Sequence, residues 1–237
     1  MRCPTRACKQ SQWPYAERTF VTDKIICPIC EKRRAERYCP AKGEKICAID
    51  CGTEREVSID CPIDCSYLVA AHRWEQDHPK PVAEDEVPFP DVSVAPDVVR
   101  THQAFLAGLG YTVLIYAVDQ RSLTDSDVFA AVQALAETRR TLLSGIYFER
   151  PPDFPIAAGL YAALGKHIEN EQKHAAEHPE LAAVKDQEIF QLLVFFLRIG
   201  KLRSNGRPRS RAFINFLRST IPVESPGEKE ESRIIIP

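Results

Sequence analysis

The sequence predicts a mainly α-helical protein in which a small cysteine-rich module, a Pro-rich linker and an antiparallel bundle of four to five helices follow one another. Three observations support this fold class. All nine cysteines lie within residues 1–65, and prolines and acidic residues dominate 79–95. Beyond Pro96 the apolar residues recur at three- and four-residue spacing, which is typical of helices packed on one another.

Composition limits the class of protein. The chain has 237 residues, of which 44% are hydrophobic and 27% charged, and its formal net charge is −2. These values favour a globular chain and exclude a polycation or a disordered acidic protein. The N-terminus lacks the apolar core of a secretory signal, and no apolar run is long enough to cross a bilayer. We therefore expect a cytoplasmic protein with no membrane contact.

Changes in composition predict five segments. These are an N-terminal segment at 1–25, the cysteine-rich module with a short helix at 26–78, the linker at 79–95, the helical bundle at 96–221 and a mobile tail at 222–237. Proline fixes φ and removes a hydrogen-bond donor, so the linker is expected to be extended and to separate two independent cores. The acidic tail ends in three isoleucines, which either dock on a groove or fold back on the bundle.

The cysteines carry the strongest chemical signal. Seven of them form three closely spaced pairs and one single cysteine. They are Cys27, Cys30, Cys39, Cys47, Cys51, Cys61 and Cys65. Pairs of thiols on tight turns deliver two sulfur ligands to one ion, which is typical of structural zinc. An iron–sulfur cluster and disulfides are alternatives, but disulfides require an oxidising compartment. Zinc would also supply stability that the small apolar core of this module lacks.

The order of these cysteines resembles the B-box zinc finger, a relative of the RING finger in which ligand pairs alternate between two ions. The resemblance covers about forty residues and rests on spacing. It implies a two-zinc cross-brace knuckle, protein association and self-association. In that pattern a first zinc is held by Cys27, Cys30, Cys47 and Cys51, and a second is shared by Cys39, Cys61 and Cys65.

The second zinc site departs from the family pattern. Lys42 stands where the family has a fourth ligand, so this site is one ligand short. His72, on a helix predicted at 66–76, can complete it. Cys3 or Cys8 can also complete it if the N-terminus folds back. A site with three thiolates and a bound water is the catalytic arrangement of zinc, so a metalloenzyme is one alternative function.

The first two helices of the bundle have clear start signals. Pro96 opens the first helix, and Gly108 and Gly110 predict a break within it. A capping box formed by Thr124 and Asp127 opens the second helix, which is expected to end near residue 149, before a Pro-Pro pair.

Three further helices are expected at 155–178, from residue 179 onward, and at 208–220. The helix that follows residue 179 is apolar nearly all round in its second half. We therefore expect it to run through the centre of the bundle.

An arginine-rich stretch at 198–218 is the second candidate functional feature. It contains no acidic residue, and four of its arginines lie in or near a predicted turn, namely Arg203, Arg207, Arg209 and Arg211. The planar guanidinium group binds phosphates and carboxylates equally well. A nucleic-acid- or ribosome-associated protein is therefore the main alternative function, beside a charged corner that only balances acidic helices.

No motif supplies an assembled catalytic centre. Residues 174–178 match the inverted zinc-protease motif, but Pro179 would end the helix at the second ligand. Glu-x-x-His pairs begin at Glu75 and at Glu171. A di-iron bundle uses two such pairs together with two further glutamates that face the bundle interior, and the sequence does not supply that arrangement. Nucleotide loops and paired nucleophiles are absent from the sequence. We expect a zinc-binding, non-catalytic interaction or adaptor protein with a protein partner or self-association, and no small-molecule substrate.

Overall fold

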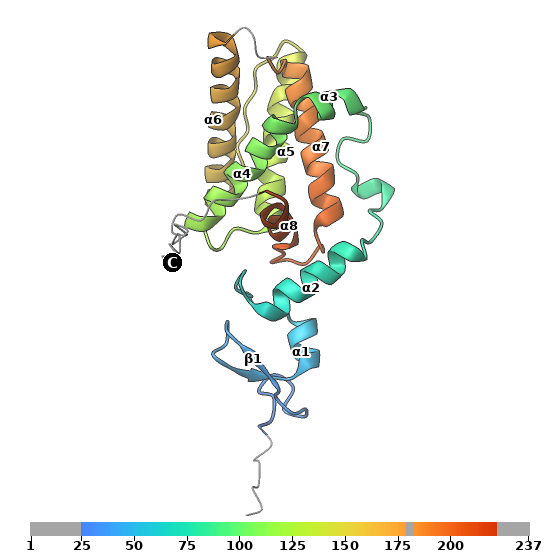
Figure 1. Ribbon diagram of the computed structural model, residues 1–237, viewed down its shortest axis with the longest axis vertical. Coiled ribbons are helices and arrows are strands. Elements are labelled where there is room, and N and C mark those ends of the chain that lie inside the picture. Colours follow the sequence, from blue (N-terminus) through green and yellow to red (C-terminus); the bar gives the residue numbers. More distant parts are fainter. Residues whose placement is uncertain (1–24, 179–182, 222–237) are drawn as a thin grey trace, which may run out of the picture.

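The computed structural model describes residues 25–178 and 183–221 (Figure 1). The described chain is mainly helical, as predicted, with eight α-helices, one short 3-10 helix and one two-stranded sheet. Three predicted features lie outside the described residues. They are the helix start at Pro179, the tail at 222–237 and, except for residue 25, the N-terminal segment with Cys3 and Cys8. No helix within the described ranges is long and apolar enough to cross a bilayer.

The cysteine-rich module, residues 25–78, is built around a short hairpin. Strand β1 (Arg37–Cys39) pairs antiparallel with β2 (Glu44–Ile46), so that Cys39 lies opposite Glu44. Gly43 has a φ of 70°, which suits the tight connection between the strands. Helix α1 (Ala48–Thr53) follows directly, and α2 (Ser66–Asp77) matches the helix expected at 66–76. The module has its own small core, in which cysteines surround buried aliphatic side chains: Ile46, Ile59 and Leu68.

Segment 79–95 contains the 3-10 helix η1 (Glu84–Glu86) and is held against the helices that follow it. Phe89 is buried in their apolar core. Arg198 donates from Nε to the Pro88 carbonyl over 3.1 Å and from Nη2 to the carbonyls of Phe89 and Val92 over 2.6 and 2.9 Å. The segment is therefore docked on its neighbours, whereas its prolines predicted an extended linker that is not packed on either core.

The described residues of the helical body, 96–178 and 183–221, form six helices, whereas four to five were expected. They are α3 (Pro96–Thr101), α4 (Gln103–Asp119), α5 (Asp125–Leu143), α6 (Pro155–Glu177), α7 (Asp186–Arg203) and α8 (Ala212–Thr220). Helix α5 packs against both α6 and α7, and α4 packs against α6 and α8. Helix α7 has fully buried residues on several sides, including Ile189, Leu192, Leu193 and Val194, in agreement with its expected central position.

Helix boundaries differ from the expected ones where tertiary contacts decide them. The first helix breaks at His102, between α3 and α4, and continues through Gly108 and Gly110. A Cβ atom on Gly108 would lie 2.5 Å from the His167 ring, so this glycine allows α4 and α6 to approach closely. The capping box of α5 is present, with Asp127 Oδ2 accepting from Thr124 N over 3.0 Å. Helix α5 ends at residue 143, earlier than expected, and α8 begins at 212 rather than 208.

Candidate metal centre and the polar interface

Four potential ligands converge in the cysteine-rich module. The thiols of Cys27, Cys30 and Cys47 and a carboxylate oxygen of Asp50 all lie within 4.8 Å of one another. The Cys27 and Cys47 thiols donate to Asp50 Oδ2 over 3.0 and 3.1 Å, and the sulfurs of Cys30 and Cys47 are 4.0 Å apart. Three of the four residues are buried and Cys30 is half-buried. This cluster could hold a metal ion.

Local backbone structure explains why these residues meet. The chain turns tightly after Cys27, where Glu31 N donates to the Cys27 carbonyl over 2.8 Å and Glu31 itself has a φ of 52°. Cys47 is the N-cap of α1, and its sulfur accepts from Asp50 N over 3.3 Å. A side chain at the third helical position reaches back toward the cap, so Asp50 is directed at the thiols.

Asp50 is a carboxylate at neutral pH. Hydrogen bonds from the thiols of Cys30, Cys27 and Cys47 lower its pKa to about 2, and the nearby Arg33 guanidinium adds a smaller effect. Arg33 Nη1 lies 3.6 Å from Asp50 Oδ1. Three thiolates and one carboxylate around a divalent ion carry a net charge of −2, which this arginine partly offsets.

The fourth position of this cluster differs from the expected ligand set. The resemblance placed Cys51 there, whereas the structure places Asp50 there. The two residues are neighbours on α1, and successive residues of an α-helix point about 100° apart. Cys51 instead lines a small cavity together with Cys39, Cys61 and Cys65. The seven described cysteines are all free thiols.

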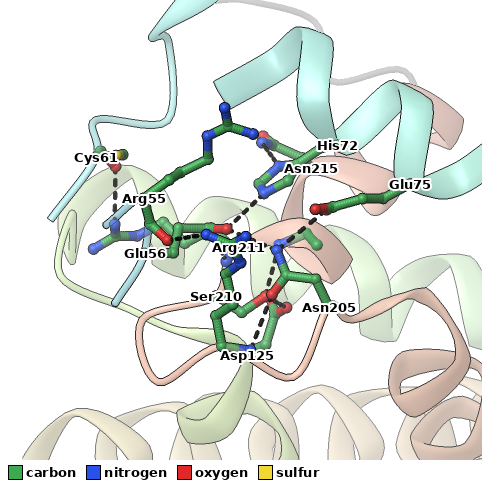
Figure 2. A network of polar contacts seen from close by, with 12 residues as sticks. Arg55, Glu56, Cys61, His72, Glu75, Asp125, Asn205, Ser210, Arg211 and Asn215 are labelled. Carbon is green, nitrogen blue, oxygen red and sulfur yellow. Dashed lines mark hydrogen bonds and ion pairs between the residues drawn. The ribbon is translucent and has the colours of Figure 1, made fainter. Parts of the chain in front are cut away.

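The structure places His72 away from the thiol cluster, in a polar contact between the module and the helical body (Figure 2). Its Nε2 lies 2.9 Å from Glu56 Oε2, and its Nδ1 lies 2.7 Å from Asn215 Nδ2. The Asn215 amide donates to Nδ1, which leaves Nε2–H to donate to Glu56. Both ring nitrogens are therefore used, and the predicted role of His72 as a metal ligand does not fit this geometry.

Glu56 is the centre of this interface. It is fully buried, and its carboxylate also accepts from Asn205 Nδ2 over 2.8 Å and from Arg211 N over 2.7 Å. Burial raises the pKa of Glu56, but the hydrogen bonds from His72, Asn205 and the Arg211 backbone outweigh burial, and the net shift is downward. Glu56 is thus held as a buried carboxylate by donors from α2 and from the connection between α7 and α8, as Figure 2 shows.

A second buried carboxylate, Asp125, joins helices within the body. Its Oδ2 accepts from Ser210 Oγ over 2.6 Å and from Phe213 N over 3.1 Å, and its Oδ1 accepts from Ile214 N over 3.3 Å. These two amides belong to the first turn of α8, where Arg211 provides no side-chain cap. Burial raises the pKa of Asp125, and these hydrogen bonds offset part of the shift. The first residue of α5 therefore caps α8.

The four arginines expected to bind anions all contact the cysteine-rich module. Arg203 donates to the Gln76 carbonyl over 3.4 Å, and Arg207 donates to the Gly52 carbonyl over 3.0 Å and to the Arg55 carbonyl. The backbone amide of Arg209 donates to the Glu56 carbonyl over 2.9 Å.

Arg211 is the most deeply placed of the four. It is 4% exposed and donates from Nη1 to Asp60 Oδ1 over 2.7 Å and to the Cys61 carbonyl over 3.1 Å. The side chains of Arg203, Arg207 and Arg211 thus contact the module, whereas the Arg209 side chain is exposed.

Comparisons with known proteins add no further constraint. No family model matches the chain, and neither the curated proteins nor the solved structures give a match.

The sequence pattern did not identify Asp50 and Glu56 as central residues. The Cys-x-x-Asp spacing from Cys47 was a usable signal for Asp50, because it repeats the Cys-x-x-Cys spacing of the first pair. Glu56 gave no signal, because its partners lie far away in the sequence.

Proposed function

We propose that this protein is a zinc-binding, non-catalytic adaptor. Metal binding would drive folding of the cysteine-rich module, and the chain would associate with a protein partner or with itself. The observation that carries the metal assignment is the convergence of Cys27, Cys30, Cys47 and Asp50 within 4.8 Å. Thiolates favour zinc over the hard cations calcium and magnesium, and four protein donors suit its tetrahedral geometry. A reducing compartment such as the cytoplasm, which keeps thiols available as metal ligands, is the location that we propose.

The ligand set supports a structural rather than a catalytic role. Catalytic zinc keeps one position for water or substrate, whereas this cluster offers four protein donors. The module also has only a small apolar core, so that metal binding would supply much of its folding free energy. A B-box-like knuckle with two zinc ions is the form of the module that we propose.

The arginine contacts weigh against a nucleic-acid-binding function for segment 198–218. Arg207 and Arg211 direct guanidinium donors at carbonyl groups of the module, and Arg198 directs its donors at segment 79–95. Phosphate contacts require guanidinium groups that face solvent. We therefore favour the adaptor function.

Exposed apolar side chains between α5 and α6 support protein association. Ile146, Tyr147, Phe148 and Phe154 are 64%, 67%, 59% and 73% exposed. Phe148 and Phe154 also line a groove of about 600 Å³ beside α5. Contiguous exposed aromatic residues are typical of protein interfaces. We propose that a second copy of the chain occupies this surface, in keeping with the self-association that the B-box resemblance implies.

Metal analysis tests the zinc assignment. The full chain, purified without chelator, is expected to contain stoichiometric zinc, and Cys27→Ser and Asp50→Ala are expected to lower the zinc content or the affinity measured against a chromogenic chelator. Asp64→Ala, which removes an exposed carboxylate of the same module, is the matched control and should leave both unchanged. A folded chain that contains no metal would contradict the assignment.

Sedimentation equilibrium tests the association. We expect a concentration-dependent dimer that the double substitution Phe148→Asp and Phe154→Asp abolishes. Val118→Asp, which changes a 69% exposed apolar residue of α4, is the control and should leave the dimer intact. A chain that stays monomeric at high concentration, or a dimer that only the control disrupts, would contradict self-association through this surface.

A further inference from the structure

A second group of thiols in the module surrounds one small cavity. Cys39, Cys51, Cys61 and Cys65 all line it, and its volume of about 10 Å³ leaves room for a single atom or ion. Apolar residues, among them Ile46, Ile59 and Leu68, also line it. All four cysteines are free thiols.

We propose that these four cysteines form a second zinc site, in which Cys51 replaces the fourth ligand that this chain lacks at Lys42. The site deepens the proposed function, since it would make the module a two-zinc unit. It also reassigns two ligands, because Asp50 takes the place of Cys51 in the first site and Cys51 takes the place of His72 in the second. Each Zn²⁺ that binds would displace the thiol protons to solvent.

Backbone structure brings the four thiols to one cavity. Cys39 ends β1, where its carbonyl accepts from Gly43 N over 2.9 Å in the hairpin connection. Cys65 is the N-cap of α2, and its amide donates to the Pro62 carbonyl over 3.0 Å, which forms a tight turn after Cys61. The pair Cys61 and Cys65 is thus folded as one unit against the end of the hairpin.

Helix geometry explains the division of ligands between the two sites. Asp50 and Cys51 are consecutive residues of α1, so they point about 100° apart. Asp50 faces the Cys27 and Cys47 thiols, and Cys51 faces the cavity. Helix α1 would therefore contribute one ligand to each ion and fix the two sites relative to each other.

Arg55 gives an independent indication of a missing hydrogen-bond acceptor at this cavity. It lines the same cavity, and its Nε is a buried donor with no hydrogen-bond partner within the described part of the chain. A buried donor without a partner is destabilising. A zinc ion with four thiolates carries a net charge of −2, and its sulfur atoms accept hydrogen bonds. Arg55 would compensate that charge.

Cadmium-113 NMR of the full chain, reconstituted with ¹¹³Cd²⁺, tests this proposal. The chemical shift of the metal reports the number of sulfur ligands, so we expect two resonances, one typical of four sulfurs and one of three sulfurs with oxygen. Cys51→Ser should move or remove only the four-sulfur resonance, and Asp50→Asn should move only the other. His72→Ala, the control, should keep both resonances.

The outcomes separate the second site from the proposed function. A single resonance with mixed sulfur and oxygen ligation would support the first site and overturn the second. Loss of a resonance in His72→Ala, or a shift of the same resonance by both Cys51→Ser and Asp50→Asn, would also overturn the second site. No bound cadmium at all would contradict both. If Cys51→Ser does not fold, the presence or absence of the four-sulfur resonance in the unmodified chain still decides.

Discussion

Glu56 joins the two cores of the molecule through a single carboxylate. Its partners His72 and Asn205 come from α2 and from the connection between α7 and α8, and Arg211 donates its backbone amide. A buried carboxylate is tolerated only when hydrogen bonds replace the lost water. All of these donors together therefore fix the position of Glu56, and each donor has Glu56 as its buried acceptor.

Glu56→Ala is expected to destabilise the whole chain. The substitution leaves the donors of His72, Asn205 and Arg211 buried without an acceptor, so we expect the free energy of unfolding to fall by about 3 kcal/mol. Urea unfolding followed by circular dichroism measures this change. Glu44→Ala, which removes an exposed glutamate of β2, should change it by less than about 0.5 kcal/mol. Equal effects of the two substitutions would show that the Glu56 contacts contribute nothing.

The same carboxylate predicts a dependence of stability on pH. The pKa of Glu56 is lower in the folded chain than its ordinary value of 4.5. Its stabilising contribution is therefore present above pH 4.5 and is lost as the pH falls through the folded-state pKa, because the unfolded chain binds the proton first. The stability difference between the unmodified chain and Glu56→Gln should shrink across that acid range. A difference that grows toward low pH would mean that the sign of the shift is wrong.

At the level of elements, small residues set the distance between helices. Gly200 in α7 lies against α5 and α8, and a Cβ atom there would be 2.5 Å from Phe129 Cε1 and 3.2 Å from Phe213 Cε1. Both neighbours are aromatic rings in or beside the apolar core. The backbone of α7 can approach these rings only because residue 200 has no side chain.

Gly200→Ala is expected to destabilise the helical body by about 1–3 kcal/mol, although alanine favours helices. Gly165→Ala in α6 is the matched control, because the nearest atom, Leu135 Cδ2, would lie 3.9 Å from the new Cβ. There we expect stabilisation of up to about 1 kcal/mol from helix propensity. Thermal unfolding measures both changes. Stabilisation of both variants would show that the close approach at Gly200 is unimportant.

Elements that depend on local chemistry could be predicted from the sequence. The capping box at Thr124 and Asp127 starts α5 as expected, because both partners lie within one helical turn. The break expected at Gly108 and Gly110 is absent, because these glycines serve contacts with His167 and Ile221, which are distant in sequence. The three-residue strands β1 and β2 are too short to produce an alternating pattern.

The candidate site was predictable to a similar degree. Spacing identified Cys27, Cys30 and Cys47 as residues that lie together. It could not decide between Asp50 and Cys51, because that choice depends on where α1 begins and which side it turns toward the thiols. His72 was expected at a metal because helical spacing places it near Cys65. Its contacts with Glu56 and Asn215 come from packing against α8, which spacing does not reveal.

In the whole molecule, the cysteine-rich module lies at one end of the helical body, and its helix α2 contacts α8 (Figure 1). Their apolar cores are separate clusters, and Ile63 of the module packs against the core of the helical body. Arg211, Arg207 and Glu56 carry many of the hydrogen bonds between the two parts. The two parts are therefore distinct in their cores but coupled through buried charges, unlike the independent units that the proline-rich segment suggested.

This coupling predicts that removal of metal also weakens the helical body. Chelation should unfold the module and leave the Arg211 guanidinium without its partners Asp60 and Cys61. The thermal midpoint of the helical signal should fall by roughly 5 °C, as expected for a loss of about 2 kcal/mol in a chain of this size. In Arg211→Ala the midpoint should start lower and respond less to chelator. A helical midpoint unaffected by chelator would indicate independent units.

X-ray absorption at the zinc edge of the purified full chain is the most direct test of metal binding by the cysteine-rich module. We expect a first shell dominated by sulfur at about 2.3 Å with a minor oxygen contribution at about 2.0–2.2 Å, which is the signature of thiolates together with the Asp50 carboxylate. Asp50→Ala should reduce the oxygen contribution that comes from the protein. A first shell made mainly of nitrogen and oxygen, or no zinc in the folded chain, would contradict the metal centre.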